Sequence, residues 1–413
     1  MSDLEERVAD IARKFAIKNA VDYGVARSDT VINKIFLELP SAKEIGMVNV
    51  RAIVDSVVGE INSMSRDELE KEYKMYTFLE QKQRVGLPDL GWADQNTHVN
   101  TRFAPNPSGY LHIGHAKIAI LCDEYSKRYK GKFFVRFEDT DPRTKRPIVA
   151  AYQSIIDDLE WLGCDIGGVF KQSERLPIYY SFAERLLKDG NAYVCLCAKE
   201  EMQENRRAGR ECRCRDADPA TNIANWKRMF ADFGEGEASL RLKTDMSHPN
   251  TSIRDWIMFR IIDDEHPLTG KVYRVWPLYN FASAIDDHEM GINLIIRGKE
   301  HEINGLKQAY VYDYFGWELP HIMEVGILKV EGTLAHKSDI IRAIKSGELR
   351  GWDDPRAPTV AGFRSRSMSP EAIREYVVGS GIGKNDSYLD VKKLDSINRK
   401  YLASKEHRAS DSR

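Results

Sequence analysis

The sequence predicts an α/β fold built on a parallel sheet. From about residue 98 onward, segments typical of strands alternate with segments typical of helices. Residues 98–105 and 132–140 are expected to be strands, whereas 116–129 and 150–163 carry apolar residues at helical spacing. Strands that alternate with helices of this length favour parallel pairing through crossover helices. Because 413 residues exceed one ordinary core, we also expect several domains.

The segment 1–97 is predicted to be a helical accessory region. Apolar residues recur at helical spacing at Leu4, Val8, Ile11 and Phe15 and again across residues 50–61. Ser65 followed by Glu68 has the pattern of a capping box that opens a further helix. Since this segment carries no recognisable chemistry, we expect it to pack as a helical bundle or to dock a protein partner.

The α/β pattern is interrupted and then resumes. We expect a first half at 98–180, an insertion rich in Cys, Arg and Asp at 181–275, a second half at 276–345, a helical region at 346–402 and a polar tail at 403–413. Ser369 and Pro370 favour a helix start within the helical region. The polar tail is expected to be disordered.

Composition excludes several classes of protein. The mixture of 42% hydrophobic and 30% charged residues is typical of a globular enzyme. No apolar run is long enough to cross a bilayer and the N-terminus is charged, so we expect no membrane association and no signal peptide. Six cysteines without a secretory leader favour the cytoplasm. With a net charge of −2, any RNA-binding surface must be a local patch.

The most informative stretch is RFAPNPSGYLHIGHAK, residues 102–117. Two prolines and a glycine predict a sharp turn after a strand, and His112, Gly114 and His115 stand where the next helix begins. A helix N-terminus offers unpaired N–H groups and a positive dipole, and both suit phosphate. A lone histidine is more often structural, but two imidazoles flanking Ile-Gly in a strand–turn–helix context favour contacts with phosphoryl oxygens.

This stretch resembles the HIGH signature of class I aminoacyl-tRNA synthetases, in the form found in the glutamyl and glutaminyl branch. Residues 136–147 and 276–301 resemble the same branch, and 351–369 resemble its archaeal and eukaryotic members. The chain is thus similar to archaeal-type glutamyl-tRNA synthetases over nearly its whole length. The resemblance implies a Rossmann-like catalytic domain, an inserted acceptor-stem-binding domain with zinc, and a C-terminal helical stem-contact region.

The resemblance also implies a reaction: ATP and Mg²⁺ activate glutamate to glutamyl-adenylate, which is transferred to the 3′ end of tRNA. The implied ATP-binding residues are Asn106, His112, Gly114, His115 and Lys337, of which His112, His115 and Lys337 are the expected catalytic residues. The expected partners are therefore the tRNA acceptor end and glutamate, and we expect a monomer.

The implied glutamate-binding residues are Arg102, Ala104, Asn106, Glu138, Tyr279, Ser283 and Arg297. Glu138 is expected to face the ammonium group, and Arg102 and Arg297 the carboxylates, because a guanidinium meets a carboxylate through two hydrogen bonds. The alternative is a structural ion pair among these charged residues at strand ends. Asp286, Asp287 and His288 are expected to shape the nucleotide pocket by hydrogen bonding, because three adjacent residues cannot all face one metal ion.

Four cysteines form two C-x-C pairs, Cys195 with Cys197 and Cys212 with Cys214, separated by fourteen residues. Four thiolates suit a tetrahedral, structural zinc ion. The spacing differs from the commoner C-x-x-C, so the alternative of four reduced cysteines in a loop stays open. Relatives carry zinc in the inserted domain, and this favours a zinc knuckle.

Arginines crowd the same insertion. Arg206, Arg207, Arg210 and Arg213 are expected to contact backbone phosphates of the acceptor stem, although a charge run is also typical of a solvated surface. Asp141 is a further candidate for contact with the tRNA 3′ end.

The sequence departs from the family in two places. Where class I enzymes carry the lysine loop written KMSKS, this chain has GTLAHKSDII at 332–341, with Asp339 in place of the critical lysine and Lys337 as a substitute two residues earlier. An aspartate beside a polyphosphate repels it. Similarity stops near residue 402, so we expect no anticodon-binding barrel. Transfer of glutamate to another acceptor and a catalytically silent RNA-binding role are the alternative hypotheses.

Overall fold

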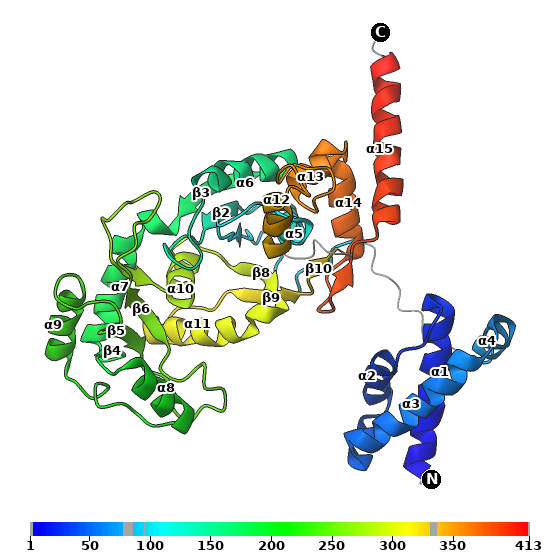
Figure 1. Ribbon diagram of the computed structural model, residues 1–413, viewed down its shortest axis with the longest axis horizontal. Helices are drawn as coiled ribbons and strands as arrows, with labels where there is room; N and C mark the ends of the chain where they lie inside the picture. Colours follow the sequence, from blue (N-terminus) through cyan, green and yellow to red (C-terminus); the bar gives the residue numbers. More distant parts are fainter. Residues whose placement is uncertain (1–2, 77–85, 95, 331–336, 412–413) are drawn as a thin grey trace. The chain divides into compact units, whose positions relative to one another are not determined.

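The computed structural model describes residues 3–76, 86–94, 96–330 and 337–411, which fall into two compact units, Met1–Gln83 and Arg84–Arg413 (Figure 1). Each unit has its own hydrophobic core. Across the described ranges, no helix combines the length and the apolar character needed to span a bilayer.

The described residues of the first unit form helices, and this unit ends at Gln83, before the predicted boundary at residue 97. It contains α1 (Asp3–Tyr23), α2 (Ser28–Glu38), a 3-10 helix η1 (Pro40–Ile45), α3 (Met47–Ser63) and α4 (Arg66–Tyr73). The expected capping box is confirmed: the Ser65 hydroxyl accepts from the Glu68 N–H and the Glu68 carboxylate accepts from the Ser65 N–H. Arg13 of α1 pairs with Glu60 of α3 and Glu72 of α4, which ties the three helices together.

The second unit is built on a five-stranded parallel sheet, which confirms the predicted fold class. Its strands are β1 (Thr101–Phe103), β2 (Phe133–Phe137), β3 (Ile166–Lys171), β8 (Leu294–Gly298) and β9 (His321–Val325), in the order β3-β2-β1-β8-β9. The chain builds outward from β1 in one direction and from β8 in the other. The strand order therefore reverses between β1 and β8, and such a switch point creates a crevice at the carboxyl ends of the strands.

Crossover helices connect these strands. They are α5 (Ile113–Arg128), α6 (Val149–Trp161), α10 (Tyr279–Glu289) and α11 (Glu302–Phe315), with 3-10 turns η2 (Gln172–Glu174) and η3 (Lys299–His301) beside them. Helix α5 follows β1 directly and is buried along most of its length, because Ala116, Ala119 and Ile120 pack on the sheet. This packing fixes the N-terminus of α5 at the switch point.

An antiparallel sheet is inserted between the two halves of the parallel sheet (Figure 1). Its strands are β4 (Ala192–Cys195), β5 (Ser239–Leu242), β6 (Ile257–Ile261) and β7 (Val275–Pro277), accompanied by α7 (Leu176–Lys188), α8 (Lys199–Ala208) and α9 (Pro219–Met229). Buried aromatic residues, among them Trp226, Phe259 and Trp276, form its core together with side chains of α7 and α10.

The C-terminal part contains α12 (Lys337–Lys345), α13 (Val360–Ser365), α14 (Pro370–Ser380) and α15 (Val391–Asp411), and a short parallel pair, β10 (Leu328–Lys329) with β11 (Ser387–Tyr388). Ser369 caps α14 by accepting from the Ala372 N–H, as its position before Pro370 predicted. Helix α14 packs on α5, and Arg374 pairs with Asp123 at 2.6 Å.

The predicted disorder of the tail is wrong as far as Asp411, because α15 continues through these residues. Leu394 is fully buried and anchors the start of the helix. Once a helix is anchored, adding residues avoids the cost of nucleation, and Ala, Lys, Glu and Arg are strong helix formers. Polar composition alone was therefore not sufficient to infer disorder here.

Candidate active site

A cavity of about 420 Å³ opens at the switch point of the parallel sheet. Its walls come from the carboxyl ends of β1, β2 and β8, the N-termini of α5 and α10, and β10. Nine of the residues predicted from the sequence line it: Arg102, Ala104, Asn106, His112, Gly114, His115, Glu138, Tyr279 and Arg297. The structure therefore brings the expected phosphate-handling turn and the expected amino-acid pocket into one cleft.

His112 and His115 stack at the N-terminus of α5, with ring centroids 3.7 Å apart. His112 is the N-cap residue: its Nδ1 accepts from the Gly114 N–H at 3.1 Å, and His115 Nδ1 accepts from the His112 N–H at 3.5 Å. A neutral imidazole that accepts at Nδ1 carries its proton on Nε2. Both rings are therefore in the tautomer that donates from Nε2.

Gly114 is required by this geometry. A Cβ at this position would lie 2.9 Å from the His112 ring and 3.1 Å from the Leu328 carbonyl oxygen. Because only hydrogen fits there, the first turn of α5 approaches β10 closely, and both elements line the cavity. The sequence prediction of a bare helix N-terminus at Gly114 thus agrees with the contacts around it.

Arg102, which lines the cavity, belongs to a buried network of charges. Asp287 Oδ1 accepts from Arg102 Nε at 3.0 Å and from Arg136 Nη1 at 2.6 Å. Burial alone would lower the pKa of Arg102, but Asp287 outweighs it and the pKa is raised. Burial alone would raise the pKa of Asp287, but Arg102 and Arg136 outweigh it and the pKa is lowered. All three groups are therefore charged.

The neighbouring Asp286 supports the same network from the other side. Its carboxylate accepts from Arg175 at 2.8 Å and Tyr179 at 2.6 Å, and lies 3.8 Å from Arg136 Nε. The sequence predicted that Asp286, Asp287 and His288 shape the nucleotide pocket by hydrogen bonding. The structure shows hydrogen bonding by both aspartates, but their partners are arginines, Tyr179 and Gln172. His288 instead stacks on Trp317, and none of these three residues lines the cavity.

Glu138 is held at the cavity wall. Its carboxylate accepts from the Ser283 hydroxyl at 2.9 Å, and its carbonyl oxygen accepts from the Asn106 amide at 2.6 Å. Burial raises the pKa of Glu138, although Arg136 and Arg102 act in the opposite direction. Ser283 does not line the cavity, so its contact with any ligand would be indirect, through Glu138.

Arg297 of β8 has a different environment from the other arginines. Its Nη1 donates to the amide oxygen of Gln308 on α11 at 3.1 Å. Burial lowers its pKa. Gln308 carries no sequence signal as a site residue, because it lies within an ordinary helix and only the fold brings it to Arg297. Arg136 was missed although it lies two residues before Glu138, since a charged residue inside a strand is commonly solvent-exposed.

Residues 332–336 of the lysine loop and the Lys337 side chain lie outside the part of the chain that the structure describes. Helix α12 begins at Lys337, and its Ile340 lines the cavity. Asp339 lies 3.5 Å from Arg342 on the same helix. On the described part of the cavity wall, Lys329 contributes an ammonium group, which Asp386 holds at 2.8 Å.

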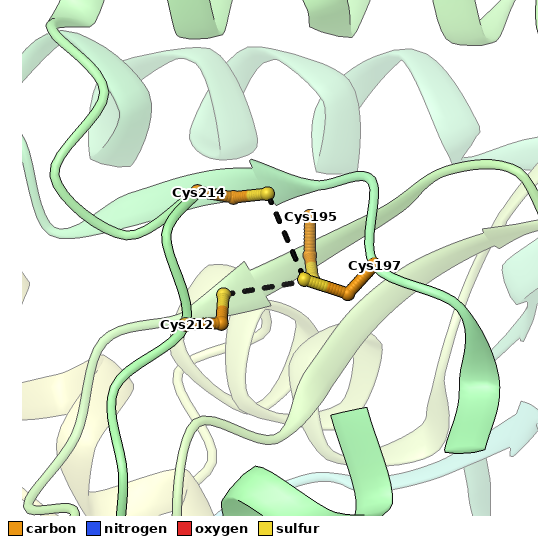
Figure 2. Close-up of side chains that lie close together, drawn as sticks. All are labelled: Cys195, Cys197, Cys212 and Cys214. Carbon is orange, nitrogen blue, oxygen red and sulfur yellow. Dashed lines mark hydrogen bonds between the residues drawn. The ribbon is translucent and has the colours of Figure 1, made fainter. Parts of the chain in front are cut away.

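The four cysteines of the insertion form one cluster (Figure 2). Cys195 and Cys197 lie at the end of β4, and Cys212 and Cys214 in the loop after α8. Their sulfur atoms lie within 4.8 Å of one another, with 3.8 Å between Cys195 and Cys212 and 3.9 Å between Cys197 and Cys214. Thiolates about 2.3 Å from a tetrahedral zinc ion lie about 3.8 Å apart, so these residues fit zinc.

The predicted RNA-contact residues differ in exposure. Arg207 and Arg213 are exposed, and Arg210 is exposed beside Glu204 at 2.8 Å. Arg206 is half-buried and donates to the Thr251 carbonyl oxygen. Asp141 accepts from the Arg143 and Thr144 N–H groups and pairs with Arg260. The structure therefore gives Arg206 and Asp141 structural contacts of their own.

The parallel sheet with its crossover helices, and the cavity at the switch point, define a doubly wound α/β domain with an antiparallel insertion. The sequence profile described as "tRNA synthetases class I (E and Q), catalytic domain" matches residues 98–404. The chain belongs to this family of class I tRNA synthetases for glutamate and glutamine.

Curated relatives are archaeal proteins named glutamate–tRNA ligase. The chain is 45% identical to the Pyrococcus furiosus protein over 406 residues, which are 96% of this chain and 71% of that one. It is 47% identical to the Pyrococcus horikoshii protein, covering 96% of this chain and 70% of that one. Among solved structures, a glutamate tRNA ligase from Elizabethkingia meningosepticum has a TM-score of 0.54 at 22% identity, covering 74% of this chain and 70% of that one. This last likeness supports the fold.

Proposed function

We propose that this protein is a glutamate–tRNA ligase: it activates glutamate with ATP and transfers it to the 3′ end of tRNA. One observation carries the proposal. The paired imidazoles of α5 and the charged groups Glu138, Arg102 and Arg297 line the same cavity, so a nucleotide phosphate and an acidic amino acid fit side by side. Archaeal relatives at 43–47% identity carry the same function in their names.

In the first step, an α-carboxylate oxygen of glutamate attacks the α-phosphorus of ATP. A new O–P bond forms, the bond to the bridging oxygen breaks, and pyrophosphate leaves with Mg²⁺, which enters as part of the ATP substrate. The enzyme contributes orientation and charge stabilisation. Glu138 binds the ammonium group, Arg102 and Arg297 bind the carboxylates, and Tyr279, Ala104 and Asn106 complete the amino-acid pocket.

His112 and His115 donate from Nε2 to phosphate oxygens as negative charge develops. The Nδ1 contacts at the start of α5 hold the rings in the required tautomer. Lys337 is proposed to approach the same phosphates from the start of α12. In the second step, a ribose hydroxyl of the terminal adenosine attacks the glutamyl carbonyl carbon, its proton leaves, and AMP departs.

We further propose that segment 181–275 binds the acceptor stem and that its four cysteines hold structural zinc. The zinc would fix the loop after α8 to β4. The proposed contacts with RNA phosphates are Arg207 of α8 and Arg210 and Arg213 of the loop that follows it. Asp141 is a weaker candidate at the 3′ end. We propose that residues 276–345 form the second half of the catalytic domain and that 346–402 form a helical region in contact with the tRNA stem. We also propose that the protein is a cytoplasmic monomer and that its N-terminal helices dock a protein partner.

A catalytically silent RNA-binding role is the second candidate, and Asp339 favours it. An acidic side chain at the start of α12 opposes polyphosphate binding. Exchange of labelled pyrophosphate into ATP, measured with and without tRNA, separates the candidates, because it reports the activation of glutamate. Glutamate-dependent exchange in either condition supports the ligase, and its absence at high enzyme concentration with tRNA present supports the silent role.

The variant His112→Ala tests the site itself. Removing an imidazole that stabilises the transition state should lower the exchange rate on the order of a hundredfold. His98→Ala is the matched control, because His98 is exposed and outside the cavity wall. Equal rates in the two variants would contradict the proposed role of His112. Transfer to tRNA(Glu) with and without its anticodon arm, and to other RNA acceptors, then identifies the acceptor.

A further inference from the structure

Three guanidinium groups are buried at the amino-acid side of the cavity, and they differ in their counterions. Arg102 and Arg136 share Asp287, and Arg136 also lies near Glu138 and Asp286. In the part of the chain that the structure describes, no ion pair involves Arg297. These contacts leave Arg297 as the buried cation of this group whose charge the protein does not neutralise.

The residues around Arg297 provide no direct counterion. Glu324 lies opposite Arg297 in the β8–β9 ladder, but its carboxylate pairs with Lys384 at 3.2 Å. The hydrogen-bond acceptor for Arg297 is instead the neutral amide of Gln308. Within the described residues, Arg297 Nε has no hydrogen-bond partner although it is buried. A buried cation with unmet hydrogen-bonding capacity at a cavity wall is suited to bind an anion from outside the protein.

A glycine on α11 fixes where the guanidinium lies. A Cβ at Gly305 would lie 2.3 Å from Arg297 Nη2, whereas real contacts of that kind are much longer. Gly305 stands inside a helix, where glycine is less favourable than alanine by about 1 kcal/mol. The helix thus tolerates a poor helix former at the point where the Arg297 guanidinium needs room.

We propose that Gly305 and Gln308 are positioning residues for glutamate specificity. Gly305 gives the Arg297 guanidinium room against α11, and Gln308 orients it with a neutral acceptor, so the substrate side-chain carboxylate becomes its counterion. An acidic residue at 308 would form an internal ion pair and compete with the substrate. The proposal rests on the proposed function, because it names the group that reads the acidic side chain.

Gln308→Glu tests the charge argument. The new carboxylate should pair with Arg297, so the substrate can no longer make its charge-assisted bidentate contact with this guanidinium. The KM for glutamate should therefore rise on the order of ten- to a hundredfold. The KM for ATP should stay within about twofold. Glutamine as a competitive inhibitor should lose much less affinity than glutamate, because its side chain brings no charge. Equal losses for glutamate, glutamine and ATP would overturn the proposal.

Gly305→Ala tests the steric argument and keeps the proposal falsifiable if the first variant folds poorly. The added methyl group must displace the guanidinium, so the glutamate KM should rise about tenfold or more while Tm stays equal or increases. Gly59→Ala is the matched control, because Gly59 lies inside α3 and a Cβ there meets nothing within 4 Å. An unchanged glutamate KM in Gly305→Ala would overturn the role of Gly305.

Glutamate binding by calorimetry, with the unmodified protein in parallel, separates this inference from the proposed function. If the unmodified protein neither binds glutamate nor supports exchange, the proposed function fails, and the inference fails with it. If the unmodified protein is active and the variants bind glutamate normally, only the inference fails.

Discussion

Asp287 is the residue whose replacement should reveal how the site is held together. Its side chain is 1% exposed, and one oxygen accepts from both Arg102 and Arg136. In Asp287→Asn the amide oxygen can still accept, but the negative charge that both guanidiniums share is lost. The guanidinium groups of Arg102 and Arg136 then lie close together in the interior without the negative charge that offsets their repulsion.

The size of the effect follows from burial. Removing one partner of a buried ion pair costs about 3–5 kcal/mol, because the remaining charge is left uncompensated. The retained acceptor oxygen places Asp287→Asn near the lower end, at about 3 kcal/mol. For a unit of this size, about 2 °C of Tm is lost for each kcal/mol, so Tm should fall by roughly 6 °C.

Thermal unfolding monitored by circular dichroism measures this loss. Asp313→Asn is the matched control, since Asp313 lies on the exposed end of α11 and should change Tm by about 1 °C or less. A Tm difference between the two variants within experimental error would refute the idea that Asp287 neutralises the arginine pair.

The same experiment has a pH dependence with a defined sign. Because the pKa of Asp287 is lowered in the folded protein, its stabilisation is fully present above the unfolded pKa of about 3.9 and is lost as pH falls through the folded pKa. The stability gap between the unmodified protein and Asp287→Asn should therefore be constant near neutrality and should shrink below about pH 4.

Two further outcomes follow from the structure. Purified protein should contain one zinc ion per chain by elemental analysis, and the variant Cys212→Ser should lose most of this zinc. The control Cys164→Ser, at a buried cysteine outside the cluster, should retain its zinc. Equal zinc content in the two variants would contradict the proposed zinc site. Gly326→Ala should destabilise the fold by several kcal/mol, because a Cβ there would lie 1.9 Å from the Asn385 carbonyl oxygen, which is backbone and cannot turn away. Gly379→Ala, where a Cβ meets nothing within 4 Å, is its control in chemical denaturation, and similar midpoints would refute the steric argument.

The sequence by itself determined the features that are local along the chain. The strand end, turn and helix start that present His112, Gly114 and His115 lie within sixteen residues, 102–117, so their geometry follows from short-range preferences for turns and helix starts. The two C-x-C pairs of the insertion are local in the same sense. Alternating strands and helices likewise sufficed to predict the parallel sheet.

Tertiary structure decided which charges meet. Arg102 and Asp287 lie 185 positions apart, and Arg136 and Asp287 lie 151 apart. In a chain with 63 acidic residues, composition and periodicity cannot select the partner of an arginine. The same holds for Gln308 and Gly305, which look ordinary in a helix until the fold lays that helix against Arg297. Ion pairs and steric contacts depend on distance in space, and only the packing of sheet and helices sets that distance.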